Sequence, residues 1–84
     1  MDNSAALLFK CFDQLERQMS ADGAYSYKII VSNDPQLRHL IVSFDNLLQR
    51  ARHYVFTGLL KQARRLVVAL QALSAKIAGI LAES

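Results

Sequence analysis

Cysteine is nearly absent from this sequence, since Cys11 is the single one among 84 residues. A chain with one cysteine cannot form an internal disulfide, which excludes a disulfide-stapled secreted scaffold and fits a reducing compartment. The first ten residues also lack the charge order and the small-residue cleavage site of a signal peptide. We therefore expect a cytoplasmic protein.

Motifs of enzymes and of metal sites are missing as well. The sequence has no glycine-rich phosphate loop, no HExxH, no paired-cysteine motif and no serine in a nucleophile-elbow context. His39 and His53 would lie about 21 Å apart along a helix, too far to share a metal ion. The sequence therefore predicts no catalytic activity, no cofactor and no metal.

Proline and glycine, which interrupt helices, are equally scarce, with one proline and three glycines. Apolar residues instead recur at steps of three and four, the period of an amphipathic helix. Asp22 and Gly23 mark a helix end, and Asp34 followed by Pro35 marks a helix start. We predict a single all-α domain over residues 1–84, a three-helix bundle with helices over 4–21, 35–55 and 59–82 and a connector over 22–34.

The last helix carries the widest apolar face. Its predicted core seam is Phe56, Leu59, Ala63, Leu66, Leu70, Leu73, Ile77 and Ile80. Nearly opposite lies a face of small residues without charge, which is unusual for a solvated helix: Ala72, Ala75, Gly79 and Ala82. We therefore predict that homodimerisation completes the bundle. The residues expected at an oligomer or partner interface are Leu66, Leu70, Ala72, Leu73, Ala75, Ile77, Gly79 and Ile80.

The junction of the last two helices leaves two alternatives, because their apolar seams are out of register. Either Gly58 closes the first helix and a short turn makes an antiparallel hairpin, or one helix runs on through a four-residue stutter. An unbroken helix over 35–82 would be about 70 Å long, too long for a compact monomer. We predict the break.

Residues 66–82 are apolar apart from Gln71, Ser74 and Lys76. That stretch of about 17 residues is shorter than the roughly 20 that a membrane-spanning helix needs. A membrane is therefore not expected as a partner.

Residues 24–32 depart from the helical pattern, because aromatic and β-branched residues alternate with smaller or polar ones there. Two structures remain open for residues 25–31. One is a short strand that pairs with its copy in another chain or with a partner protein, and the other is an ordered extended connector.

Charge is divided unevenly along the chain. Residues 1–34 carry three basic and five acidic side chains, whereas residues 35–84 carry seven basic and two acidic ones. No acid lies between Asp45 and Glu83. Six residues flank the predicted hairpin turn and form the basic group, our candidate patch for an anionic partner: Arg50, Arg52, His53, Lys61, Arg64 and Arg65. Alternatively, these cations pair with acids of the first helix such as Asp13 and Glu16.

The run Tyr27-Lys28-Ile29-Ile30-Val31-Ser32-Asn33-Asp34-Pro35-Gln36-Leu37 resembles the strand and helix start of ribbon-helix-helix DNA-binding proteins. The resemblance covers these eleven residues only. It implies a dimer that places a paired β-ribbon in the major groove of DNA. Lys28, Ile30 and Ser32 would then face the bases.

Two functions follow from these patterns. The apolar helix faces predict a small protein–protein interaction module, such as an adaptor, a secretion-chaperone-like protein or a regulatory subunit, that works as a homo-oligomer. The alternative is a dimeric nucleic-acid-binding regulator of the ribbon-helix-helix type, which would use a strand over 25–32 and the basic group. A homodimer and a protein partner are the interactions we expect first.

Overall fold

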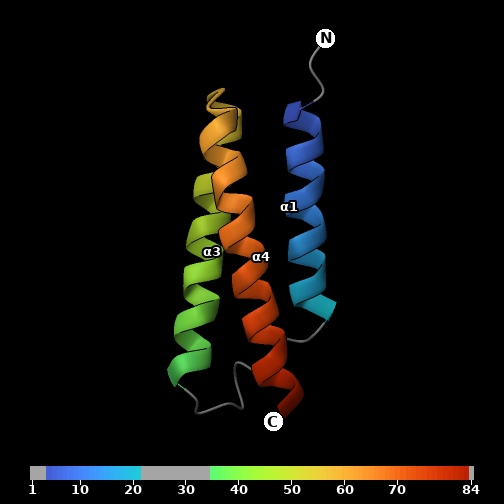
Figure 1. Cartoon of the computed structure of the whole chain (residues 1–84), viewed down its shortest axis with the longest axis vertical. Coiled ribbons are helices and arrows are strands. Elements are labelled where there is room, and N and C mark those ends of the chain that lie inside the picture. The colour runs from blue at the N-terminus through green and yellow to red at the C-terminus, as the bar shows by residue number, and fades with distance from the viewer. Residues whose placement is uncertain (1–3, 22–34, 84) are drawn as a thin grey trace.

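The computed structural model describes residues 4–21 and 35–83, which form three helices: α1 (Ser4–Ala21), α3 (Pro35–Phe56) and α4 (Leu60–Glu83). α3 and α4 make an antiparallel hairpin, and α1 lies beside it, parallel to α4 (Figure 1). The bundle is elongated, with extents of 46 × 19 × 17 Å. The prediction of an all-α three-helix bundle is confirmed. The strand considered for 25–31 and the connector over 22–34 lie outside the described residues.

The turn between α3 and α4 confirms the predicted break at Gly58, whose φ is 84°. The Gly58 N–H donates to the Val55 carbonyl at 3.1 Å, and the Leu59 N–H donates to the Tyr54 carbonyl at 2.7 Å. This pair of bonds is the Schellman motif that ends a helix at a left-handed residue. The Thr57 hydroxyl also donates to the Tyr54 carbonyl, at 3.2 Å. The carbonyls of His53, Tyr54 and Val55 therefore accept hydrogen bonds within the turn, where the chain reverses.

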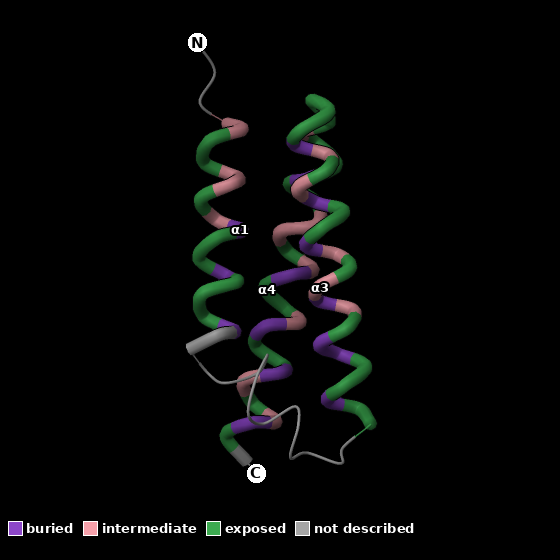
Figure 2. The backbone as a smooth tube through the Cα atoms, turned by 180° about the vertical axis from the view of Figure 1, so that it is seen from behind, coloured by how far each residue is buried: buried purple, intermediate pink, exposed green. Residues whose placement is uncertain are grey.

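The core forms where the apolar faces of the three helices meet. α3 supplies seven buried residues at steps of three and four: Leu37, Leu40, Ile41, Phe44, Leu48, Ala51 and Val55. α1 adds Phe12, Leu15 and Met19, and α4 adds Ala63, Leu70, Ile77 and Leu81. Figure 2 shows these buried positions along the inward sides of the helices.

The predicted seam of the last helix is wrong at its first two positions. Phe56 is 84% exposed and Leu59 is 45% exposed. Phe56 belongs to α3, where it follows the buried Val55 by about 100° of helical rotation and so leaves the inward face. Leu59 lies in the turn that connects α3 to α4 and belongs to neither helix. The buried residues of α4 therefore begin at Ala63.

α4 is longer than the apolar stretch considered from sequence. From Leu60 to Ala82 it is long and apolar enough to cross a membrane, judged by length and composition. The core helix of a soluble bundle meets the same criterion, so one such helix is weak evidence for a membrane. In this bundle Leu70 and Ile77 are fully buried, and 22% of the apolar window of α4 is buried. Length and composition therefore do not place α4 in a membrane, and the cytoplasmic location stays a prediction.

Candidate interaction surfaces

The basic group lies at the hairpin end of the bundle, around the turn between α3 and α4. The last turns of α3 and the first turns of α4 carry its members, so the chain reversal brings them together. Five of the six are exposed: Arg50, His53, Lys61, Arg64 and Arg65. The hairpin end is thus rich in accessible cations.

Arg52 is the member of the basic group that is drawn into the bundle. Its Nη2 lies 3.0 Å from Oδ1 of Asp13 and 3.6 Å from Oε2 of Glu16, both on α1. Arg64 also contacts α1, because its Nη2 donates to the Ser4 Oγ at 3.0 Å. The alternative in which the cations pair with acids of the first helix is therefore confirmed for Arg52, within one chain.

Removing the Arg52 contacts is expected to have a small effect on stability. The side chains of Asp13 and Glu16 are about half exposed, and solvent-exposed pairs contribute roughly 0 to 1 kcal/mol. We expect Arg52→Gln to lower the free energy of unfolding by less than about 1 kcal/mol, and the difference to shrink in roughly 1 M salt. Urea unfolding measures it. Arg50→Gln makes the same change at an exposed cation and is the control. If Arg52→Gln lowered the free energy of unfolding by more than about 2 kcal/mol, the pair of Arg52 with Asp13 would be shielded from water.

A second surface is the outward face of α4, made of Val68, Ala72, Ala75, Gly79 and Ala82. All five residues are exposed, and Val68 is 69% exposed. A Cβ added at Gly79 would meet no atom within 4 Å, so the packing of this bundle does not require glycine there. The outward face is therefore apolar and exposed, and Ala75 at its edge also lines a groove beside α1.

The residues predicted for an oligomer or partner interface divide between this face and the core. Leu70 and Ile77 are fully buried, and half-buried residues pack beside them: Leu66, Leu73 and Ile80. The exposed members are Ala72, Ala75 and Gly79. The large side chains of the predicted interface are thus occupied in the bundle, and the small ones remain accessible.

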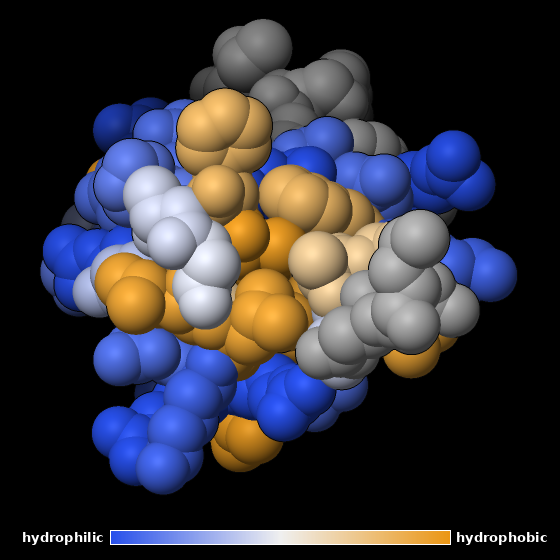
Figure 3. Space-filling model, turned by 90° about the horizontal axis from the view of Figure 1, so that it is seen from above, coloured by the Kyte–Doolittle hydropathy of each residue, from blue (hydrophilic) through white to orange (hydrophobic). Residues whose placement is uncertain are grey.

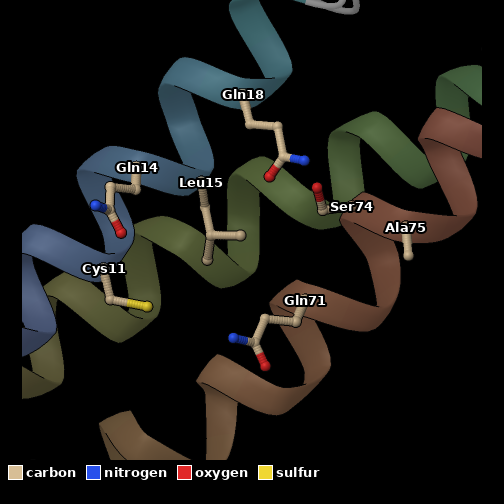
Figure 4. A pocket seen from close by; sticks show the side chains of 7 residues that line it. All are labelled: Cys11, Gln14, Leu15, Gln18, Gln71, Ser74 and Ala75. Atoms are coloured by element: carbon tan, nitrogen blue, oxygen red, sulfur yellow. The ribbon is translucent and has the colours of Figure 1, made fainter.

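A third surface is a groove of about 300 Å³ between α1 and α4 (Figure 4). Its lining has three carboxamides, a thiol and a hydroxyl but no charged group: Cys11, Gln14, Leu15, Gln18, Gln71, Ser74 and Ala75. Carboxamides both donate and accept hydrogen bonds, so this groove suits neutral polar groups such as peptide amides. Sequence reasoning missed it, because glutamines on two helices form no motif until the packing of those helices is known.

The exposed apolar side chains at the hairpin end form a fourth surface, which we call the apolar apex: Phe56 and Leu59. Figure 3 shows an apolar area at this end of the bundle, bordered by hydrophilic residues. Sequence reasoning missed the apex because it placed both residues in the core seam of the last helix.

Metal ligands do not gather in the part of the chain that the structure describes: over 4–21 and 35–83, no three or more His, Cys, Asp and Glu side chains are grouped to hold an ion. Comparison with protein-family models, with curated proteins and with solved structures gave no match to this chain. Function must therefore be inferred from the surfaces themselves.

Proposed function

We propose that this chain is a small non-catalytic protein–protein interaction module that works as a homo-oligomer through the outward face of α4. The observation that carries the proposal is the absence of charged side chains among the exposed residues of this face, which are alanine or glycine apart from Val68. A helix face in water normally carries polar residues. A face of small apolar residues instead allows a second helix to approach closely, at interaxial distances of about 8–10 Å.

An antiparallel pair of α4 helices fits this face best. With Ala72 of each chain beside Ala75 of the other, the exposed Val68 comes opposite Gly79 of the second copy, where no side chain occupies the space. The same arrangement holds the cations of the two hairpin ends apart, and it brings Arg65 near the negative end of the second copy's helix dipole. A parallel pair would place like charges side by side.

The module is expected to act as an adaptor, a secretion-chaperone-like protein or a regulatory subunit. Such proteins bind by covering an apolar stretch of a partner with helix faces. The groove between α1 and α4 supports this class, since Gln14, Gln18 and Gln71 can hydrogen-bond the peptide amides of a partner.

Self-association through the outward face is the measurable consequence. We expect sedimentation equilibrium to give the mass of a dimer at concentrations of roughly 1–100 µM, corresponding to a binding free energy near 6–8 kcal/mol. Val68→Lys would place an ammonium in the apolar interface of each copy, so the dissociation constant should rise at least tenfold.

Val42→Lys is the matched control, because Val42 is also exposed, at 57%, but lies on α3. It should leave the mass unchanged. A folded monomer at about 100 µM, shown by circular dichroism on the same sample, would remove self-association from the proposal.

A nucleic-acid-binding regulator is the second candidate, favoured by the four exposed cations Arg50, Lys61, Arg64 and Arg65 at one end of the bundle. The residues that the resemblance to ribbon-helix-helix proteins would place against the bases are Lys28, Ile30 and Ser32, and all three lie outside the described residues. This candidate therefore rests on the exposed cations alone. Its test is included in the experiment below.

A further inference from the structure

The hairpin end combines an exposed aromatic ring with a surrounding set of cations. Phe56 has the highest exposure among the exposed large hydrophobic residues of the described chain, 84%, and Leu59 of the same apex is 45% exposed. Keeping a phenyl ring in water forfeits the stabilisation that its burial would give. An exposed aromatic at the end of a helical hairpin therefore points to a partner that receives it.

The cations lie at defined depths below the apolar apex. At a helical rise of about 1.5 Å per residue, Lys61 is about 3 Å along the axis from the apex. Arg64, Arg65 and Arg50 follow at about 8–9 Å. All four are exposed. Amphipathic elements at a bilayer surface bury their apolar residues about 5–10 Å into the boundary between headgroups and acyl chains. The cations would then lie level with the lipid phosphates.

Acidic side chains are kept away from this end in the described residues. α3 carries no acid after Asp45, and the first acid within α1 is Asp13, about 13 Å along the helix from Ser4. Asp2 precedes α1 and lies outside the described residues. Asp13 is also paired with Arg52. Among the described residues, the charge around the apex is therefore positive and fits an anionic surface.

We propose that the hairpin end binds the surface of anionic membranes, with Phe56 and Leu59 inserted between lipids and the exposed cations of the basic group on the lipid phosphates. Hydrophilic residues border part of the apolar area in Figure 3. Double-stranded DNA would contact the cations but would offer Phe56 no apolar environment. Lipid headgroups and acyl chains together complement both parts of the surface.

This proposal concerns binding at the surface of a bilayer, whereas the sequence argument against a membrane concerned a spanning helix. Phe56 and Leu59 do not belong to the outward face of α4, although Arg65 serves in both proposals. Val68→Lys and Phe56→Ser therefore test self-association and membrane binding separately.

The first test is co-sedimentation with vesicles of phosphatidylcholine, with or without roughly 30% phosphatidylserine, at about 0.1 M salt. We expect the natural chain to bind the anionic vesicles and not the neutral ones. Replacing Lys61 and Arg65 together by Gln should weaken binding about 25-fold, or about fivefold for each cation. Replacing Arg17 and Lys76 by Gln makes the same change of charge away from the hairpin end, and it should change binding less than about threefold.

The second test separates insertion from charge attraction. Phe56→Ser should weaken binding to the anionic vesicles about tenfold, because it removes the inserted ring. Val42→Ser, which also makes an exposed apolar residue polar, should leave binding unchanged. The chain contains no tryptophan, so Phe56→Trp adds a single reporter of its surroundings. Its fluorescence should shift to the blue on anionic vesicles, and that of Val42→Trp should not.

Three results would overturn the proposal. One is equal binding to neutral and anionic vesicles, and another is unchanged binding of Phe56→Ser. The third is a chain that binds a DNA duplex in a mobility-shift titration and binds no vesicles. If that DNA binding required Lys61 and Arg65 but not Phe56, the cations would be assigned to nucleic acid. If vesicle binding fails while the natural chain still dimerises, the membrane proposal falls and the interaction module stands.

Discussion

Phe44→Ala is expected to lower the free energy of unfolding by about 3–5 kcal/mol, the usual cost of truncating a buried phenylalanine. Phe44 lies in the middle of α3 and is 0% exposed. Its removal leaves a cavity in a single core to which all three helices contribute. Small domains have total stabilities of about 5–15 kcal/mol, so this variant should lie close to the limit of folding. Urea unfolding followed by circular dichroism measures the loss.

Phe56→Ala is the matched control, because it deletes the same atoms at a position that is 84% exposed. Its effect on the free energy of unfolding should stay within about 0.5 kcal/mol. Comparable losses in the two variants would mean that Phe56 is covered, by a second copy or by another partner, under the conditions of the measurement.

Gly58→Ala is expected to lower the free energy of unfolding by about 1–2 kcal/mol, since a residue with a Cβ pays this cost in the left-handed region. Gly58 has a φ of 84°, and a Cβ built there would meet nothing within 4 Å. The loss therefore comes from the backbone and not from a clash. A reversible thermal or urea transition gives its size.

Gly79→Ala should act in the opposite direction. Gly79 lies inside α4 with free space around it, and alanine is more stable than glycine in a helix interior by about 0.5–1 kcal/mol. The two glycine variants should therefore move the unfolding midpoint to opposite sides of the natural chain. Dilute samples keep self-association from contributing to the comparison. A higher free energy of unfolding for Gly58→Ala would contradict the left-handed turn at Gly58.

The helices of this protein could be predicted closely from sequence, because periodicity and end signals agree. α1 spans the predicted residues 4–21, and the bounds of α3 and α4 differ from prediction by one residue at most at either end. Pro35 begins α3. Gly58, whose backbone is left-handed, makes the turn between α3 and α4. Both are local effects of one residue type on its own backbone, and a sequence displays such effects directly.

The candidate surfaces were less accessible to sequence reasoning, because they depend on how helices rotate and pair. Phe56 fits the seam of the last helix by spacing, and its exposure follows from belonging to α3 instead. The pairing of Arg52 with Asp13 requires α1 to dock beside α3, a choice that no periodicity encodes. The groove lined by Gln14 and Gln71 depends on the same docking.

The tight turn between α3 and α4 also makes the hairpin more stable than the docking of α1 against it. Closing a short loop costs little chain entropy, so the hairpin can form before α1 docks against it. α1 is shorter than either hairpin helix, and its described residues contribute three core side chains where α3 contributes seven. Native-state hydrogen exchange should therefore show α1 as a separate unit that opens while the hairpin persists. Each such opening bares the inner side of the hairpin, so the chain can offer a partner a far larger apolar surface without unfolding.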